Sequence, residues 1–129
     1  MAVLAPPRHP GLGLVVSVSD EGAAAVIVLR GEAELAARPG LVDLLIRSIA
    51  DHEGPVVIDL AQVELLDCAI VMALERAGVF LSGRGRRLVL RSPSRRALPV
   101  LAGHGVSHLI EAVPQGHGVA ALPSADSSA

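Results

Sequence analysis

A short apolar run near the middle of the chain constrains the fold more than any other feature. Residues 55–60, PVVIDL, are rich in β-branched side chains and almost uninterrupted by polar ones. This pattern is typical of a strand that is covered on both faces of a parallel sheet. Parallel strands need long crossover connections, which are usually helices. The run therefore predicts the central strand of an α/β domain.

Helical patterns stand on both sides of this run. Before it, apolar residues recur at helical spacing from Leu41 to Ile49, with charged residues opposite, and the segment ends near Gly54. After it, CAIVMALERAGVFLSGRG begins at Cys68 and continues for about four helical turns. A further strand, RRLVLRS, and a poorer helix follow, in which Pro99 must lie in the first turn or cause a kink.

The beginning of the chain predicts a hairpin. LGLVVSVSD alternates apolar and small polar residues, EG supplies a turn, and AAAVIVLRG is a second strand. The expected order is β-β-α-β-α-β-α, with parallel strands wherever a helix crosses between them. We therefore expect an α/β domain with a small mixed sheet of four to five strands and helices packed mainly on one face.

The domain is expected to occupy residues 13–122. Residues 1–12 are rich in proline and glycine and predict a loose arm, whereas the small polar residues 123–129 predict a flexible tail. Residues 112–122, AVPQGHGVAAL, fit either a strand or a helix. No signal-peptide pattern and no apolar run near the roughly 20 residues of a membrane span is present, so we expect a cytoplasmic protein without membrane insertion.

Composition excludes several functions. The chain has a net charge of -2, one Phe and no Trp or Tyr, so it has neither the basic charge nor the stacking surfaces of a nucleic-acid binder. All basic side chains are arginines, which excludes a Schiff-base or phosphate-loop lysine. GRGRR and GLGLVV match no nucleotide-binding motif in its required context. We expect no catalytic residue, no cofactor and no enzymatic activity.

Two groups of side chains suggest ligands only weakly. His104 and His108 are four residues apart, but glycines flank His104 and no carboxylate stands at a matching offset, so no metal site is predicted. Six arginines concentrate in the C-terminal half and fit a solvated face, with an acidic partner or an anionic headgroup as the alternative. They are Arg84, Arg86, Arg87, Arg91, Arg95 and Arg96.

The order of elements is joined by motifs that resemble STAS domains. VIVLRGEAELAARPGL resembles the strand, Gly-Glu turn and helix entry of that family. VVIDLAQVELLDCAIVMAL resembles its strand ending in Asp-Leu, a short link and the Asp-Ser-Ser-Gly that opens the next helix. LVLRSPS, RRAL and LAGHGVSHLIE resemble the later strand, Ser-Pro turn and third helix. The resemblance covers residues 14–112.

This resemblance implies a cytoplasmic protein-interaction domain, typified by anti-sigma-factor antagonists. In that family a GHKL-type kinase, the anti-sigma factor, phosphorylates the serine after the aspartate, and the phosphorylated antagonist releases it. The positions that the resemblance assigns to partner binding are Glu32, Asp67, Cys68, Ala69, Ile70 and Ser92. Self-association of the domain stays open.

The motif departs from the family pattern where the phosphate would be added. Aligned on Asp67, the phosphorylated serine is replaced by Cys68. The second serine becomes Ala69 and the glycine becomes Ile70, a bulky residue at a possible contact point. The chain has no threonine, and the nearest serines, Ser48 and Ser82, lie in or at the far end of predicted helices. We expect no switching by serine phosphorylation at the usual site.

Alternatives remain for individual residues and for the function. Cys68 fits a redox switch at a helix N-terminus, which the charge of Asp67 disfavours, or a small replacement for serine. Asp67 fits a helix N-cap, a partner contact or both. Glu32 and Glu34 fit an acidic rim or a solvated turn. The functional alternatives are an accessory STAS subunit of a membrane transporter and a redox sensor based on Cys68.

Overall fold

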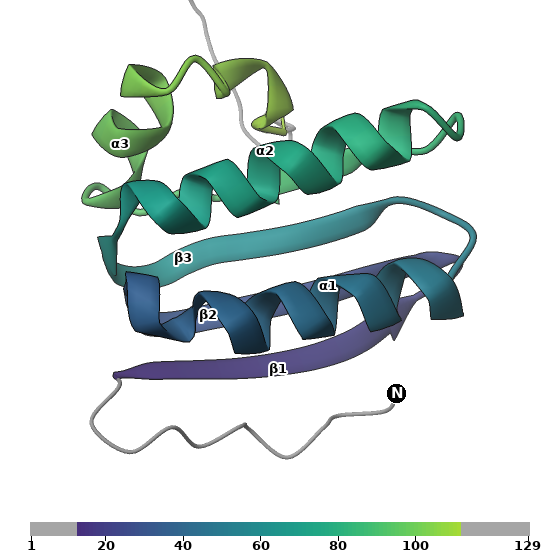
Figure 1. The fold of residues 1–129 in the computed structure, drawn as a ribbon, viewed down its shortest axis with the longest axis horizontal. Helices are drawn as coiled ribbons and strands as arrows, with labels where there is room; N and C mark the ends of the chain where they lie inside the picture. Colours follow the sequence, from purple (N-terminus) through teal and green to yellow (C-terminus); the bar gives the residue numbers. More distant parts are fainter. Residues whose placement is uncertain (1–12, 112–129) are drawn as a thin grey trace, which may run out of the picture.

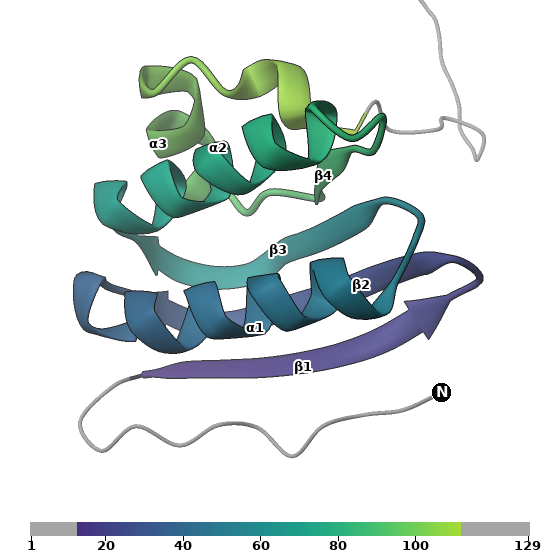
Figure 2. The same ribbon diagram turned by 45° about the vertical axis from the view of Figure 1, so that its right-hand side comes forward.

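Four strands form one mixed sheet in the computed structural model, which describes residues 13–111 (Figure 1). β1 (Leu14–Glu21) pairs antiparallel with β2 (Ala24–Ala33). β3 (Val56–Leu66) pairs in parallel with β2 on one side and with β4 (Leu88–Arg91) on the other. Figure 2 shows β4 beyond β3, at the opposite edge from β1. The predicted hairpin and the central position of the apolar run are confirmed.

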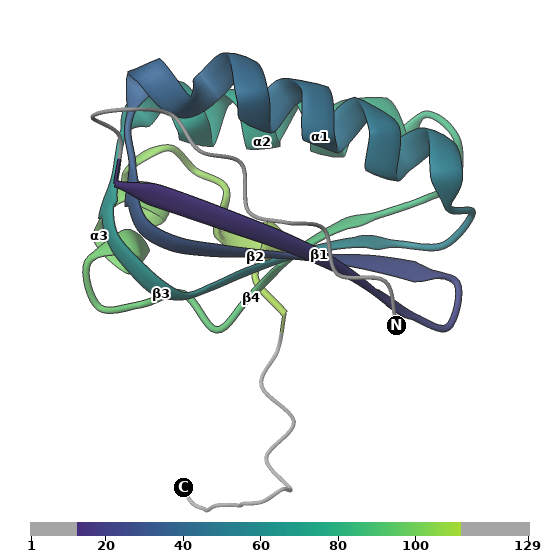
Figure 3. The same ribbon diagram turned by 90° about the horizontal axis from the view of Figure 1, so that it is seen from below.

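The two long helices lie side by side on one face of this sheet (Figures 1 and 3). α1 (Arg38–Asp51) connects β2 to β3, and α2 (Cys68–Ser82) connects β3 to β4. A 3₁₀ turn, η1 (Leu35–Ala37), precedes α1. α3 (Ala97–Gly103) and a second 3₁₀ turn, η2 (Ser107–Leu109), follow β4. The α/β class, the order of elements and the layer of helices on one face are as predicted.

The core between sheet and helices is aliphatic throughout. Alternate residues of each strand point toward the helices, and the buried faces of α1 and α2 cover them. The largest of the fully buried side chains are Ile27, Leu29, Leu41, Ile58, Leu60, Ile70, Leu74, Leu81, Leu90 and Leu101. Burying a side chain of this size contributes about 1.5–3 kcal/mol, so this layer supplies most of the stability.

β3 is longer than the sequence pattern predicts. The segment AQVELL, predicted as a short link, continues the strand to Leu66. Register shifts against β2 at Val28/Arg30 and Gly31/Glu32 accommodate this extension. At the second shift Gly31 has a φ of 100°, and a Cβ atom there would collide with the carbonyl oxygen of Gly13. Glycine is therefore required where β2 bends toward η1.

The region after β4 is less helical than predicted. α3 ends at Gly103, and Gly105 adopts a φ of 71°, a left-handed conformation that ends the helix. Pro99 lies in the first turn of α3, one of the two positions expected for it. The predicted arm, the predicted tail and residues 112–122 lie outside the described residues, so the domain boundaries stay predictions. No helix within residues 13–111 is long and apolar enough to cross a membrane.

His52, at the C-terminus of α1, ties that helix to β1. Its Nδ1 lies 2.9 Å from the carbonyl oxygen of Ser48, and its Nε2 lies 2.6 Å from Oδ1 of Asp20. Both partners are acceptors, so only the doubly protonated imidazolium donates to both. The hydrogen bond to Asp20 is the main cause that raises the pKa of His52 above its ordinary value of 6.5.

A pH-dependent contribution to stability follows. A raised pKa means that the folded state holds the proton more tightly than the unfolded state, so this contribution is complete below pH 6.5 and is lost as pH rises through the folded-state pKa. Because the Asp20 side chain is half exposed, we expect only about 0.5 kcal/mol.

Urea unfolding of the unmodified protein and of His52→Gln, from about pH 6 to about pH 9, measures this contribution. The difference in free energy of unfolding should be largest at the acid end and fall to a constant value at the alkaline end. His108→Gln, which changes an exposed histidine in η2, is the control and should show no such trend. A difference that grows with pH would contradict the assignment.

Candidate functional site

The Asp67 carboxylate fixes the N-terminus of α2. Its Oδ1 accepts a hydrogen bond from the backbone N–H of Ala69 at 3.1 Å, the N-cap predicted from the sequence. Its Oδ2 accepts from the backbone N–H of Leu35 in η1 at 3.3 Å. The backbone N–H of Asp67 donates to the carbonyl oxygen of Ala33 at 2.9 Å. One residue therefore joins the ends of β2 and β3 to the starts of η1 and α2.

Cys68 is exposed on this fixed helix end. It is the first residue of α2, and its thiol is free. Ala69, the next residue, is half-buried. The helix end therefore presents a small sulfur-bearing side chain to solvent, in the place that the sequence resemblance assigns to a phosphorylated serine.

Ile70 corrects an expectation drawn from the sequence. Its side chain is fully buried in the core with Val71 and Leu74, and none of it is available to a partner on the surface. The prediction of a bulky contact residue at this position is therefore wrong. The first turn of α2 rotates this position toward the sheet, so the isoleucine packs under the helix end instead of widening the surface.

Carboxylates gather around the same helix end. The parallel register of β2 and β3 sets Glu32 opposite Leu65, one residue before both strands end. Glu32 is exposed and Glu34 half-buried. A side-chain hydrogen bond with Glu32 is the main cause that raises the pKa of Glu34, and the negative charges of Glu32 and Asp67 add to it. We call Glu32, Glu34, Asp67 and Cys68 the α2 N-terminal surface.

Ser92 is positioned differently from the other predicted partner-binding residues. It follows β4, whose last residue, Arg91, is opposite Asp59 in the middle of β3 rather than near its end. The neighbouring Ser94 donates from its hydroxyl to the carbonyl oxygen of Val63, which anchors the turn beside β3. Ser92 is exposed and has a left-handed φ of 51°, a conformation that is uncommon for non-glycine residues.

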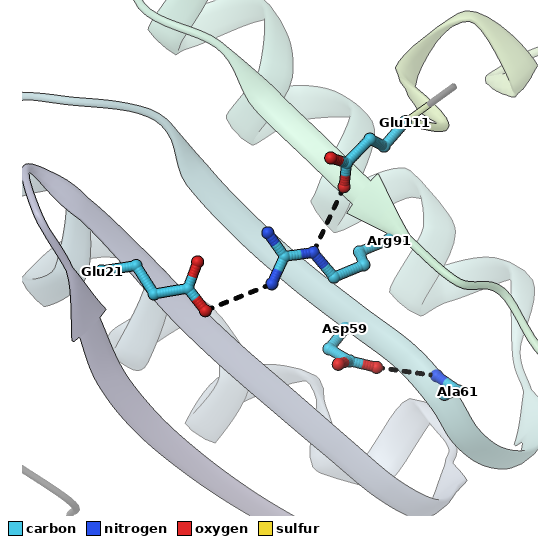
Figure 4. A network of polar contacts seen from close by, with 5 residues as sticks. All are labelled: Glu21, Asp59, Ala61, Arg91 and Glu111. Carbon is cyan, nitrogen blue, oxygen red and sulfur yellow. Dashed lines mark hydrogen bonds and ion pairs between the residues drawn. The ribbon is translucent and has the colours of Figure 1, made fainter. Parts of the chain in front are cut away.

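The arginines predicted as one basic concentration lie in different surroundings. Arg91 lies on the face of the sheet away from α1 and α2, and donates to Glu111 at 3.2 Å and to Glu21 at 3.4 Å (Figure 4). Burial lowers the pKa of Arg91, but the bonds to Glu21 and Glu111 outweigh it, so the pKa is raised. Arg91 is therefore a link between β1, β4 and the segment after η2, and is not part of a uniformly solvated basic face.

His104 and His108, which were predicted in one helix, lie in different elements of the structure. His104 follows the last residue of α3, and His108 lies in η2, so they do not share a regular helix. Within residues 13–111, no three His, Cys, Asp or Glu side chains are grouped closely enough to hold a metal ion. The α2 N-terminal surface brings together three of the six predicted partner-binding residues, Glu32, Asp67 and Cys68.

Comparison with protein families decides the relationship. The family model described as "Mlab, STAS domain" matches residues 16–111, which include every strand and helix of the structure except the first two residues of β1. The chain belongs to the STAS domain family. Comparison with curated protein sequences gives no match.

Solved structures show the same fold. SpoIIAA, an anti-sigma-factor antagonist in its unphosphorylated form, superposes with a TM-score of 0.69 at 15% identity, over 79% of this chain and 90% of that one. An anti-sigma factor antagonist from Mycobacterium paratuberculosis gives a TM-score of 0.69 at 20% identity, over 83% of this chain and 87% of that one. At these identities the likeness shows the STAS fold alone.

Sequence reasoning missed the partners that hold this STAS domain's surface together. Leu35, whose N–H binds Asp67, is separated from it by 32 positions. The sequence predicted that the strands joined by α1 are parallel, but it did not predict the register, which places residues after Ala33 beside residues after Leu66. That register depends on two bulges without a recognisable sequence signal, apart from Gly31.

The burial of Ile70 can be tested by restoring the family's glycine. Ile70→Gly removes a fully buried side chain and adds a glycine to the first turn of a helix, so we expect the free energy of unfolding to fall by about 4 kcal/mol. Met72→Gly, at a position 44% exposed, is the control and should lose only about 1–2 kcal/mol. Urea denaturation measures both, and equal losses would show that Ile70 is not a core residue.

Proposed function

We propose that this STAS domain is a non-catalytic binding protein of a partner-switching pathway. It binds a GHKL-type anti-sigma factor, or a related kinase-like protein, through the α2 N-terminal surface. The observation that carries the proposal is the Asp67-capped helix end, which exposes Cys68 and has the Glu32–Glu34 pair close to Asp67. The likeness in fold to anti-sigma-factor antagonists supports it, and a role of this kind would place the protein in the cytoplasm.

The second part of the proposal is that binding is not ended by phosphorylation at this surface. A phosphoryl group would add about -1.5 to -2 charges to a surface that already carries three carboxylates, and such a gain disrupts an interface with acidic groups. Cys68, Ala69 and Ile70 offer no hydroxyl to receive it. The domain therefore stays in its binding form when the kinase is active.

The missing hydroxyl equally favours a second candidate. An accessory STAS subunit docked on a membrane transporter would need the same rigid helix end and no phosphorylation site. The identity of the bound protein distinguishes the two candidates: a kinase-like sigma regulator supports the first, and transporter subunits support the second.

Restoring the serine tests the proposed regulation. The unmodified protein and Cys68→Ser are each mixed with purified GHKL-type anti-sigma factors of the source organism, and binding is measured by calorimetry before and after addition of ATP. Cys68→Ser should bind, gain one phosphate detected by mass spectrometry, and lose at least about tenfold in affinity, or about 1.4 kcal/mol. The unmodified protein should bind with similar affinity and stay bound.

Cys68→Ala is the control, since it removes the sulfur without adding a hydroxyl and should behave like the unmodified protein. Phosphate on Ser82 or another serine of the unmodified protein, with release of the partner, would show that the switch is present elsewhere. Absence of binding to every such factor would contradict the partner class itself.

A further inference from the structure

An apolar groove runs along the outer side of the helix layer, between α1 and α2. It has a volume of about 700 Å³, and its apolar walls include Ile46 and Ile49 from α1 and Met72 and Phe80 from α2. Ile46 is 59% exposed, Phe80 45% and Met72 44%. Contiguous exposed apolar side chains of this size are uncommon on a protein that works alone, and they mark interaction sites. Cys68 and Asp67 do not line this groove.

The charged residues of the described chain that line the groove all have one sign. They are Arg38, Arg76, Arg84 and Arg86, and no carboxylate of residues 13–111 lines it. Arg38 begins α1, whereas Arg84 and Arg86 follow the end of α2. Because α1 and α2 run side by side in the same direction (Figures 1 and 3), arginines lie at both ends of the groove. Arg76, in the middle of α2, lies between them.

The Arg86 guanidinium forms two hydrogen bonds and has one nitrogen without a hydrogen-bond partner among the described residues. Its Nε donates to the carbonyl oxygen of Gly54 at 3.0 Å and its Nη1 to that of Ile49 at 2.9 Å. These bonds fix the guanidinium at the C-terminal end of α1. Its Nη2 is buried and has no hydrogen-bond partner among the described residues. Arg86 forms no ion pair within residues 13–111, so its positive charge at this end of the groove is not neutralised by a described carboxylate.

Arg84 adds to the same end of the groove. Its guanidinium carbon lies 3.8 Å from the centroid of the Phe80 ring, close enough for a cation–π contact. The stacked pair combines an apolar wall with a positive charge. Phe, Met and Arg are the residues enriched in the buried parts of protein interfaces.

We propose that this groove binds an acidic amphipathic helix of a protein partner. The apolar residues of that helix, at i, i+3, i+4 and i+7, would lie against Ile46, Met72 and Phe80, with its Asp and Glu residues beside the arginines. Arg38 to Ala50, both lining the groove, span about 18 Å of helix, enough for three turns of a partner helix. A single anionic headgroup would meet the arginines at one end only, so the charges at both ends favour a peptide.

The groove begins one helical turn after Cys68, at Met72, but it shares no residue with the α2 N-terminal surface, so this inference does not rest on the proposed function. A partner at Cys68 and a helix in the groove would contact different residues of α2. The domain would then join two proteins, one at each surface.

Two labelled peptides test the groove. Both have about 14 residues, or roughly 20 Å of helix, with leucines on one face; one carries Glu on its flanks and the other carries Lys at the same positions. Fluorescence polarisation measures their binding to the full chain. The acidic peptide should bind, and the basic peptide should bind at least about tenfold more weakly.

Groove variants locate the binding. Ile46→Asp and Arg76→Glu change exposed residues that line the groove and should each weaken the acidic peptide by about tenfold or more. Val79→Asp is the matched control, because Val79 is 71% exposed on α2 and does not line this groove; it should leave the affinity unchanged. Thermal unfolding verifies that all three variants fold.

Three results would overturn the proposal. The first is equal binding of the acidic and basic peptides. The second is binding of the acidic peptide that Ile46→Asp and Arg76→Glu do not weaken. The third is that neither peptide binds. If phosphatidylglycerol vesicles bind in that case and Ile46→Asp abolishes their binding, the groove is assigned to lipid instead.

Discussion

The hydrogen bonds of Asp67 are the interaction on which the site depends. A strand that passes directly into a helix leaves the first N–H groups of that helix without partners. Here one carboxylate binds the N–H of Ala69 in α2 and that of Leu35 in η1. The two crossover connections of the sheet are thereby locked together at one point. These hydrogen bonds fix the arrangement of Cys68 and of the carboxylates of Glu32 and Glu34.

The departures from the STAS motif affect two different parts of the molecule. Cys68 presents an exposed thiol at the position where the sequence resemblance places a phosphorylated serine. Ile70 changes the interior, because its side chain fills the core beneath the same turn. This difference is the basis of our proposal that the α2 N-terminal surface binds a partner that phosphorylation does not release. The arginine-lined groove gives α2 a second exposed surface, which this change does not affect.

Local signals in the sequence predicted much of this structure, and long-range pairing determined the rest. The hairpin, the central strand and the start of α2 follow from alternation, a β-branched run and an N-capping aspartate. The extension of β3 to Leu66 does not, because AQVELL has no strand periodicity and is held by bulged pairing with β2. The bond from Leu35 to Asp67 depends on how η1 and α2 meet at the ends of β2 and β3, which no local pattern encodes. The burial of Ile70 could have been predicted, because Ile70, Leu74 and Leu81 recur at helical spacing on one face of α2.

The central claim is that the partner binds at the α2 N-terminal surface. The affinities of two variants, each with one glutamate changed to arginine, test it most directly. Glu32→Arg changes the α2 N-terminal surface, and Glu53→Arg makes the same change at an exposed position in the connection between α1 and β3. Calorimetry with the GHKL-type anti-sigma factor that binds the unmodified protein should show at least about a tenfold loss, or 1.4 kcal/mol, for Glu32→Arg and no change for Glu53→Arg. Equal affinities for the two variants would show that the partner binds elsewhere on the domain.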